Sequence, residues 1–223
     1  MSADYQSLYS QTRGRIAELV SDLDDAVVAE PVPATPEWSM TDVIAHLAGI
    51  LADIRAGNLE GVATDPWTAK QVEARRGKPM PELIDEWSEN ATAIEPLLPN
   101  FPPQGAAQLC ADVYTHEQDI RGALGAPGMR EGPAFENAID FFGGWLRSEL
   151  EQRDMGLCVS AGEHRWETGA ADTTLTADPF ELLRAYAGRR SPQQIRSWGW
   201  SGDPEPYLPL LSPFGLRSDP LVE

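Results

Sequence analysis

A helical repeat of apolar residues runs through most of this chain and then stops, and this change constrains the fold more than any other feature. Five stretches place apolar side chains at three- and four-residue steps, the spacing that gives a helix one apolar face. Segments rich in proline and glycine separate them. The stretches cover approximately residues 4–28, 39–55, 83–98, 104–124 and 133–153. The pattern predicts helices that pack around a shared apolar core.

Beyond Gly156 the sequence becomes a series of short β-branched or aromatic segments with turn residues between them, which is typical of strands. A helix is expected after them, over residues 180–190, with Asp178 as its N-cap. The expected strands cover residues 157–160, 165–168 and 173–176. We therefore expect a mainly α protein with a helical domain at residues 1–155 and a small α/β domain at residues 156–223.

The charge balance excludes partners that need a basic surface. The 223 residues include 17 Lys and Arg against 35 Asp and Glu, which gives a net charge of -18. Such a surface repels phosphates and anionic lipids, so neither nucleic acid nor a membrane is an expected partner. No apolar run is long enough to span a bilayer, and the first residues lack the basic and apolar regions of a signal peptide. Cys110 and Cys158 lack the spacing of a redox pair or zinc knuckle, so we expect a reducing, cytoplasmic location.

Two of the three histidines lie on expected helices and face the core. His116 falls within the apolar stripe of helix 104–124, and Asp112 lies one turn before it on the same face. His46 lies at the margin of the apolar stripe of helix 39–55 and can lean inward. Two imidazoles and one carboxylate are a ligand set of catalytic divalent-metal sites. His46, Asp112 and His116 are therefore candidate metal ligands, with zinc as the first choice of metal.

The same residues also have a purely structural interpretation. His116 would then be a core histidine satisfied by Asp112 or by a backbone carbonyl, and His46 a surface residue near a helix edge. Asp119 is either a carboxylate that supports the site or one half of an exposed charge pair with Arg121, and Glu117 is expected to be solvated. The spacing leaves these alternatives open, because nothing in the sequence shows that the two helices touch.

Two arginines, Arg189 and Arg190, end the helix expected over residues 180–190. They either complement the helix dipole or bind an anionic substrate. The sequence contains no nucleophile elbow, no P-loop and no dinucleotide fingerprint, so these common enzyme classes have no support.

Three segments resemble one known family. Residues 37–48 contain the pattern W-x-x-x-D-V-x-x-H-L, in which the histidine is His46. Residues 111–121 are similar to that family's E-x-x-x-H-x-x-D-I helix and include Asp112, His116 and Asp119. Residues 187–194 look like its C-terminal domain. The family is that of the mycothiol-dependent maleylpyruvate isomerases, a branch of the DinB-like metal-binding helical bundles.

The resemblance implies a DinB-like four-helix bundle that holds zinc through His46, Asp112 and His116, followed by a small α/β C-terminal domain. Asp112 stands where the family's zinc isomerase has Glu, and its shorter side chain leaves Asp119 as an alternative ligand. By the same resemblance Arg190 would be the catalytic arginine and Arg189 a substrate-binding one, either of them binding the carboxylates of the substrate.

The implied reaction uses mycothiol as a thiol cofactor and the metal to hold its sulfur as thiolate. The thiolate adds to the cis double bond of maleylpyruvate, the former double bond rotates, and elimination gives the trans product, fumarylpyruvate. The alternatives are a mycothiol S-transferase acting on another electrophile and a non-catalytic metal-binding or interaction module. The expected partners are a small-molecule electrophile and a low-molecular-weight thiol, and a homodimer through the tryptophan-bearing faces stays open.

Overall fold

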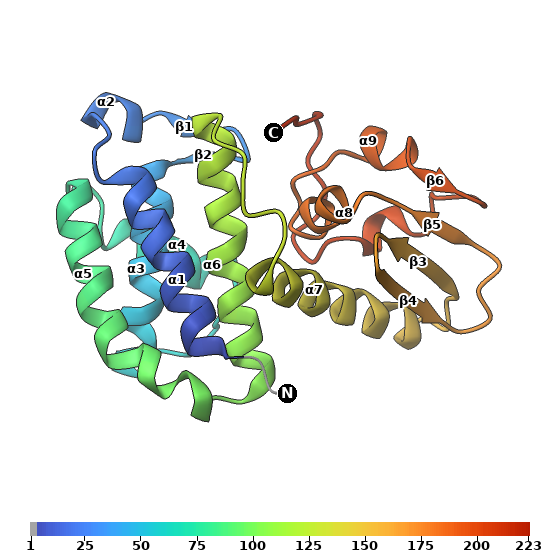
Figure 1. Ribbon diagram of the computed structural model, residues 1–223, viewed down its shortest axis with the longest axis horizontal. Coiled ribbons are helices and arrows are strands. Elements are labelled where there is room, and N and C mark those ends of the chain that lie inside the picture. Colours follow the sequence, from blue (N-terminus) through green and yellow to red (C-terminus); the bar gives the residue numbers. More distant parts are fainter. Residues whose placement is uncertain (1–3) are drawn as a thin grey trace. The chain divides into compact units, whose positions relative to one another are not determined.

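The computed structural model describes residues 4–223, which form two compact units. The first unit ends at Gly128 and the second covers Met129–Glu223 (Figure 1). The first three residues, on which part of the expectation about a signal peptide rests, lie outside the described residues. The expected mainly α fold with a small α/β part at its C-terminal side is confirmed.

Four long helices form the bundle of the first unit, and they lie side by side in Figure 1. They are α1 (Tyr5–Val20), α3 (Met40–Ala56), α5 (Met80–Ile94) and α6 (Pro103–Leu124). Helix α3 packs on α5, and α1 packs on α6. In the bundle core the fully buried Trp87 side chain donates a hydrogen bond from Nε1 to Tyr9 Oη at 3.0 Å. Burial of each large apolar side chain contributes about 1.5–3 kcal/mol to the stability of such a core.

Shorter elements connect the bundle helices. The stretch 4–28, which the sequence predicted as one helix, is divided, because α1 ends at Val20 and a separate turn of helix follows. The proline-rich stretch 31–36, predicted as a helix breaker, takes part in an antiparallel pair of strands, since proline disfavours a helix but tolerates an edge strand. These elements are α2 (Asp25–Val28), β1 (Pro31–Val32), β2 (Thr35–Ser39), α4 (Asp65–Glu73) and the 3-10 helix η1 (Glu95–Asn100).

The start of α3 is fixed by a capping box between Ser39 and Asp42. The Ser39 hydroxyl accepts a hydrogen bond from the Asp42 amide at 3.1 Å, and the Asp42 carboxylate accepts one from the Ser39 amide at 2.9 Å. Such a cap satisfies amide groups that the first turn of a helix leaves without partners. Strand β2 therefore leads directly into α3, and Trp38 is held one residue before the cap.

The second unit combines a four-stranded sheet with helices. The order of the strands is β4-β3-β5-β6; β3 pairs parallel with β5, and the other pairs are antiparallel. Asp178 caps α8 as predicted, because its carboxylate accepts from the amides of Phe180 and Glu181. The elements are α7 (Pro133–Gln152), β3 (Leu157–Ala161), β4 (His164–Thr168), β5 (Thr174–Thr176), α8 (Pro179–Tyr186), α9 (Pro192–Arg196), β6 (Gly199–Trp200) and the 3-10 helix η2 (Leu208–Leu210).

Helix α7 accounts for the difference between the expected domain boundary and the observed units. The sequence predicted the change at about residue 155, after this helix, because its periodicity matches that of the bundle helices. In the structure α7 packs on α8 and β4 and so belongs to the second unit, which begins at Met129. Across residues 4–223, no helix is both long and apolar enough to cross a membrane.

Candidate metal centre

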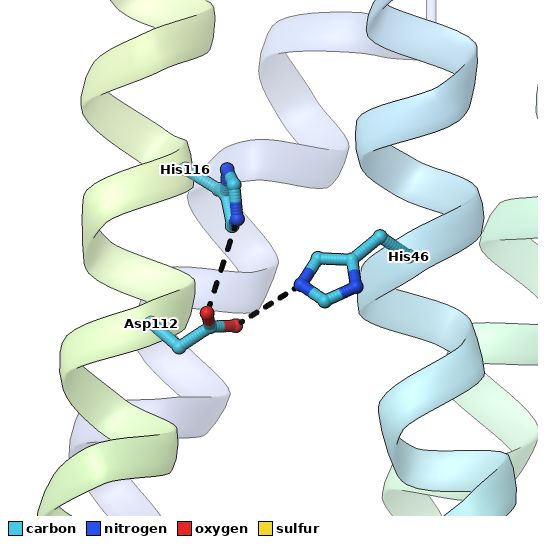
Figure 2. A group of neighbouring side chains, drawn as sticks. All are labelled: His46, Asp112 and His116. Carbon is cyan, nitrogen blue, oxygen red and sulfur yellow. Dashed lines mark ion pairs between the residues drawn. The ribbon is translucent and has the colours of Figure 1, made fainter. Parts of the chain in front are cut away.

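Two helices of the first unit bring His46, Asp112 and His116 together (Figure 2). Helix α3 supplies His46, and α6 supplies both Asp112 and His116 from adjacent turns. One ligand atom from each side chain lies within 4.8 Å of the other two. Both histidines are buried, with 4% and 6% of their surface exposed, so the interpretation of His46 as a surface residue is wrong.

The distances within this cluster suit a shared cation. The Nε2 atom of His46 lies 3.7 Å from one carboxylate oxygen of Asp112, and Nε2 of His116 lies 3.9 Å from the other. Both separations exceed those of ordinary hydrogen bonds. Zinc lies about 2.0–2.2 Å from nitrogen and oxygen ligands, which leaves neighbouring ligand atoms about 3–4 Å apart. The three side chains therefore fit a divalent ion, and the shorter Asp112 side chain reaches the point where the histidines converge.

Each histidine is held through its other ring nitrogen. His116 Nδ1 lies 3.0 Å from a carboxylate oxygen of Asp119, which is fully buried. His46 Nδ1 lies 2.9 Å from Oε1 of Gln71, on α4. Histidine ligands in metal sites commonly donate their second N–H to a carboxylate or carbonyl oxygen in this way, which orients the ring. Asp119 thus contacts Nδ1 of His116, whereas Asp112 faces Nε2.

Trp38 lies against both imidazoles. Its ring centroid is 5.1 Å from that of His46 and 5.9 Å from that of His116. The Asp112 side chain is 33% exposed, in contrast to the two buried histidines. The cluster is therefore covered by protein around the imidazoles and accessible from the side of Asp112.

The charged neighbours on α6 differ from the expectation. Glu117, expected to be solvated, is fully buried, and its carboxylate accepts hydrogen bonds from Arg15 on α1 and Arg121 on α6. The exposed pair of Asp119 with Arg121 is not what the structure shows, because Asp119 is bonded to His116 and Arg121 to Glu117. A sequence does not reveal this, since the partner Arg15 lies 102 residues away from Glu117.

The two predicted substrate arginines lie in the second unit. Arg190 is fully buried, and its guanidinium bonds both carboxylate oxygens of Glu181, at 2.6 and 2.8 Å, and one of Glu223, at 2.9 Å. Arg189 donates from Nη1 to the carbonyl of Ala187 at 2.6 Å. The carboxylates give Arg190 a sufficient structural role, and the substrate roles of Arg189 and Arg190 stay predictions.

Comparisons with known proteins agree with this fold. The family described as the mycothiol maleylpyruvate isomerase N-terminal domain matches residues 9–126. A crystal structure of the mycothiol-dependent maleylpyruvate isomerase is similar to this chain with a TM-score of 0.63 and 13% identity, over 90% of this chain and 96% of that one. A mutant of that isomerase with one histidine replaced by alanine gives a TM-score of 0.63 and 12% identity over the same shares of the two chains. No curated protein matches the chain.

The fold and the cluster together define a helical-bundle protein with a buried candidate metal centre. Because the match to residues 9–126 spans more than half of the 223 residues, the chain belongs to the mycothiol maleylpyruvate isomerase N-terminal domain family. The resemblance seen in the sequence is thus confirmed at the level of the family. The solved structures, at 12% and 13% identity, establish the shared fold.

Proposed function

We propose that this protein is a metal- and mycothiol-dependent enzyme that isomerises maleylpyruvate or a closely related cis-configured dicarboxylate. One observation carries the proposal. Two buried imidazole Nε2 atoms and one carboxylate converge on a common point, while the Nδ1 atom of each imidazole is already bonded elsewhere. Membership of the family supports mycothiol as the thiol.

In this proposal His46, Asp112 and His116 hold the ion, and zinc suits a set of two imidazoles and one carboxylate. A bound zinc ion lowers the pKa of a coordinating thiol, so that the thiol is present as a nucleophilic thiolate at neutral pH. Gln71 and Asp119 orient the two rings, and Trp38 excludes water from their faces. The accessible side, at Asp112, is where thiol and substrate would arrive.

The protein's own thiols do not fit the role of the nucleophile. Burial raises the pKa of the Cys110 thiol to about 12, which keeps it protonated at neutral pH. Cys158 is buried in the second unit. A thiol supplied from outside the chain is therefore the nucleophile that the proposal requires. The two cysteines are free thiols, which agrees with the cytoplasmic location that forms part of the same proposal.

The first test of the proposal is metal content. Protein purified without a histidine tag should contain, or take up, about one equivalent of zinc per chain. His46→Ala, Asp112→Ala and His116→Ala should each lose it. His164→Ala is the matched control, because this third histidine lies on β4 in the second unit, where it stacks on Trp166. Wild-type protein that neither contains nor binds zinc would contradict the proposal.

The second test is turnover. The zinc-loaded protein should convert maleylpyruvate to fumarylpyruvate only when mycothiol is present, and a chelator should abolish the reaction. Retained zinc with thiol-dependent turnover of another electrophile would instead identify a mycothiol S-transferase. Retained zinc without any thiol-dependent turnover would identify a non-catalytic metal-binding module and exclude the isomerase.

A further inference from the structure

Helix α4 approaches α3 unusually closely at Gly49. A Cβ atom added to Gly49 would lie 2.5 Å from Cβ and 2.8 Å from Cγ of Gln71, so any larger residue there would push α4 away. Gly49 lies one turn after His46 on α3. The missing side chain thus lets the buried Gln71 reach the imidazole of His46, at 2.9 Å.

The orientation of the Gln71 amide is fixed by a second partner. Gln71 Nε2 donates a hydrogen bond to Oδ2 of Asp53 at 2.8 Å, and Asp53 lies on α3 two turns after His46. An ionised carboxylate only accepts hydrogen bonds, so the NH2 group of the amide must face Asp53 and its oxygen must face His46. The amide oxygen cannot donate, so His46 Nδ1 must carry the proton. The Nε2 lone pair of a neutral His46 then faces Asp112.

We propose that Asp53 and Gln71 form a hydrogen-bond chain that fixes His46 as its Nδ1–H tautomer and thereby prepares Nε2 as a metal ligand. The inference rests on the metal site of the proposed function and assigns two positioning residues to it, neither of which contacts the ion. The groups around the His46 ring are consistent with this role. Trp38 covers a face of the ring, Asp112 and His116 lie toward Nε2, and Gln71 lies at Nδ1.

The hydrogen-bond chain also gives the two candidate ligand histidines different partners at Nδ1. His116 donates to the buried carboxylate of Asp119, whereas His46 donates to a neutral amide whose own donor is used by Asp53. A carboxylate partner raises the basicity of an imidazole ligand more than an amide does. The carboxylate of Asp53 thus acts on His46 only through the side chain of Gln71, whereas the carboxylate of Asp119 contacts His116 directly.

The tautomer of His46 is the direct test, because it is measured on metal-free protein. In imidazole 1H–15N correlation spectra, recorded where the ring is neutral, wild-type His46 should show the Nδ1–H pattern. Gln71→Leu should lose it. An Nε2–H pattern in the wild type, or an unchanged Nδ1–H pattern in Gln71→Leu, would overturn the inference. If wild-type protein binds no zinc, the proposed function fails, and the tautomer still decides whether the hydrogen-bond chain exists.

Zinc affinity, measured by competition with a chromophoric chelator, tests the consequence for the ligand. Loss of an outer-shell partner typically weakens metal binding about 10- to 100-fold, and Gln71→Leu should fall in that range. Gln118→Leu is the matched control, because this buried glutamine bonds the carbonyl of Gly128 and has no bond to either histidine. Equal weakening by both substitutions would overturn the inference.

A swap of the two polar groups separates positioning from packing. In the double variant Asp53→Asn/Gln71→Glu, the amide at position 53 can donate to the carboxylate at position 71, which still accepts from His46 Nδ1. The net charge is unchanged. We expect zinc affinity within a few-fold of the wild type, whereas Gln71→Glu alone places two carboxylates together and should bind more weakly than the swap. A correctly folded swap variant, verified by its melting temperature, that binds no better than Gln71→Leu would overturn the inference.

Discussion

Two buried polar clusters, one in each unit, follow different rules. In the second unit, Arg184 and Arg190 share the carboxylate of Glu223, and Arg190 also takes both oxygens of Glu181, so positive and negative groups alternate. In the first unit, the Nε2 atoms of His46 and His116 face a carboxylate at distances too long for hydrogen bonds. A buried cluster in which each charged side chain has a partner of opposite charge has a sufficient explanation in the stability of the fold. The ion pairs offset the cost of removing the charged groups from water.

The first-unit cluster brings together side chains of a different kind. With both Nδ1 atoms used as donors, the atoms that converge are two lone pairs and a carboxylate, all of which are acceptors. Acceptors that face one another repel unless a cation or a proton lies among them. The comparison teaches that burial alone does not mark a functional site. Among residues 4–223, the group of three histidine, cysteine or acidic side chains whose ligand atoms lie close enough to share a metal ion is in the first unit.

The largest effect expected from this difference is stabilisation of the wild type by zinc. A ligand at 1,000 times its dissociation constant stabilises the folded state by about 4 kcal/mol. Urea unfolding with and without saturating zinc should show an increase of this order in the wild type and none in His116→Ala. Equal stabilisation of both proteins would show that zinc binds elsewhere, and it would contradict the difference drawn between the two clusters.

The second effect concerns the charge-matched set. Arg190→Met should lower the free energy of unfolding by about 3 kcal/mol, since removing one partner of a buried ion pair costs about 3–5 kcal/mol. We expect the lower end because Glu223 keeps Arg184 and the Glu181 side chain is 35% exposed. Thermal and urea unfolding measure the loss, with zinc content as the control that should not change. A variant of wild-type stability that has lost turnover would show that Arg190 serves the substrate.

The third effect sharpens the comparison within the metal cluster. Asp119→Asn keeps the size of the side chain but removes the charge that faces His116 Nδ1. Zinc affinity should fall about 10- to 100-fold, the usual range for an outer-shell partner. Chelator competition gives the value. Complete loss of zinc in this variant, together with retention in Asp112→Ala, would instead make Asp119 the carboxylate ligand.

The smallest effect is a dependence of stability on pH. Burial opposes the ionisation of Glu181, but hydrogen bonds and the charge of Arg190 outweigh it and hold the pKa of this carboxyl below its ordinary value of 4.5. A lowered pKa in the folded state adds stability above pH 4.5 that is lost as the pH falls through the lowered pKa. Glu181→Gln should flatten the acid limb of the unfolding free energy. Glu205→Gln is the control, because the pair of Glu205 with Arg196 is exposed, and it should have the weaker effect.

The parts of the site that the sequence predicts are those fixed by helical spacing. Asp112 and His116 lie four residues apart on one helix, so their common face follows from the period of the helix alone. The capping box at Ser39 likewise sets where α3 begins and which of its faces carries His46. These local rules do not depend on the partner helix, which is why they survive in the folded protein.

The parts that the sequence misses depend on tertiary contacts. Gln71 lies between α3 and α5, in a segment where proline and glycine obscure the nine-residue helix α4. Its contact with His46 exists only because Gly49 has no side chain to block it. Glu117 was misjudged because its partner Arg15 lies on another helix. The boundary expected at about residue 155 differs from the end of the first compact unit because apolar periodicity identifies α7 as a helix without telling which elements it packs on.

The exposure of Asp112 has a kinetic consequence. Since both histidines are buried and Trp38 lies against their rings, an ion that enters or leaves meets the carboxylate first. A chelator, a thiol and a substrate would all approach from this same side. We therefore expect a bound thiol to slow the removal of the ion by a chelator. The lifetime of the metal-bound protein would then depend on which molecule occupies the exposed side of the site, as well as on the strength of the metal–ligand bonds.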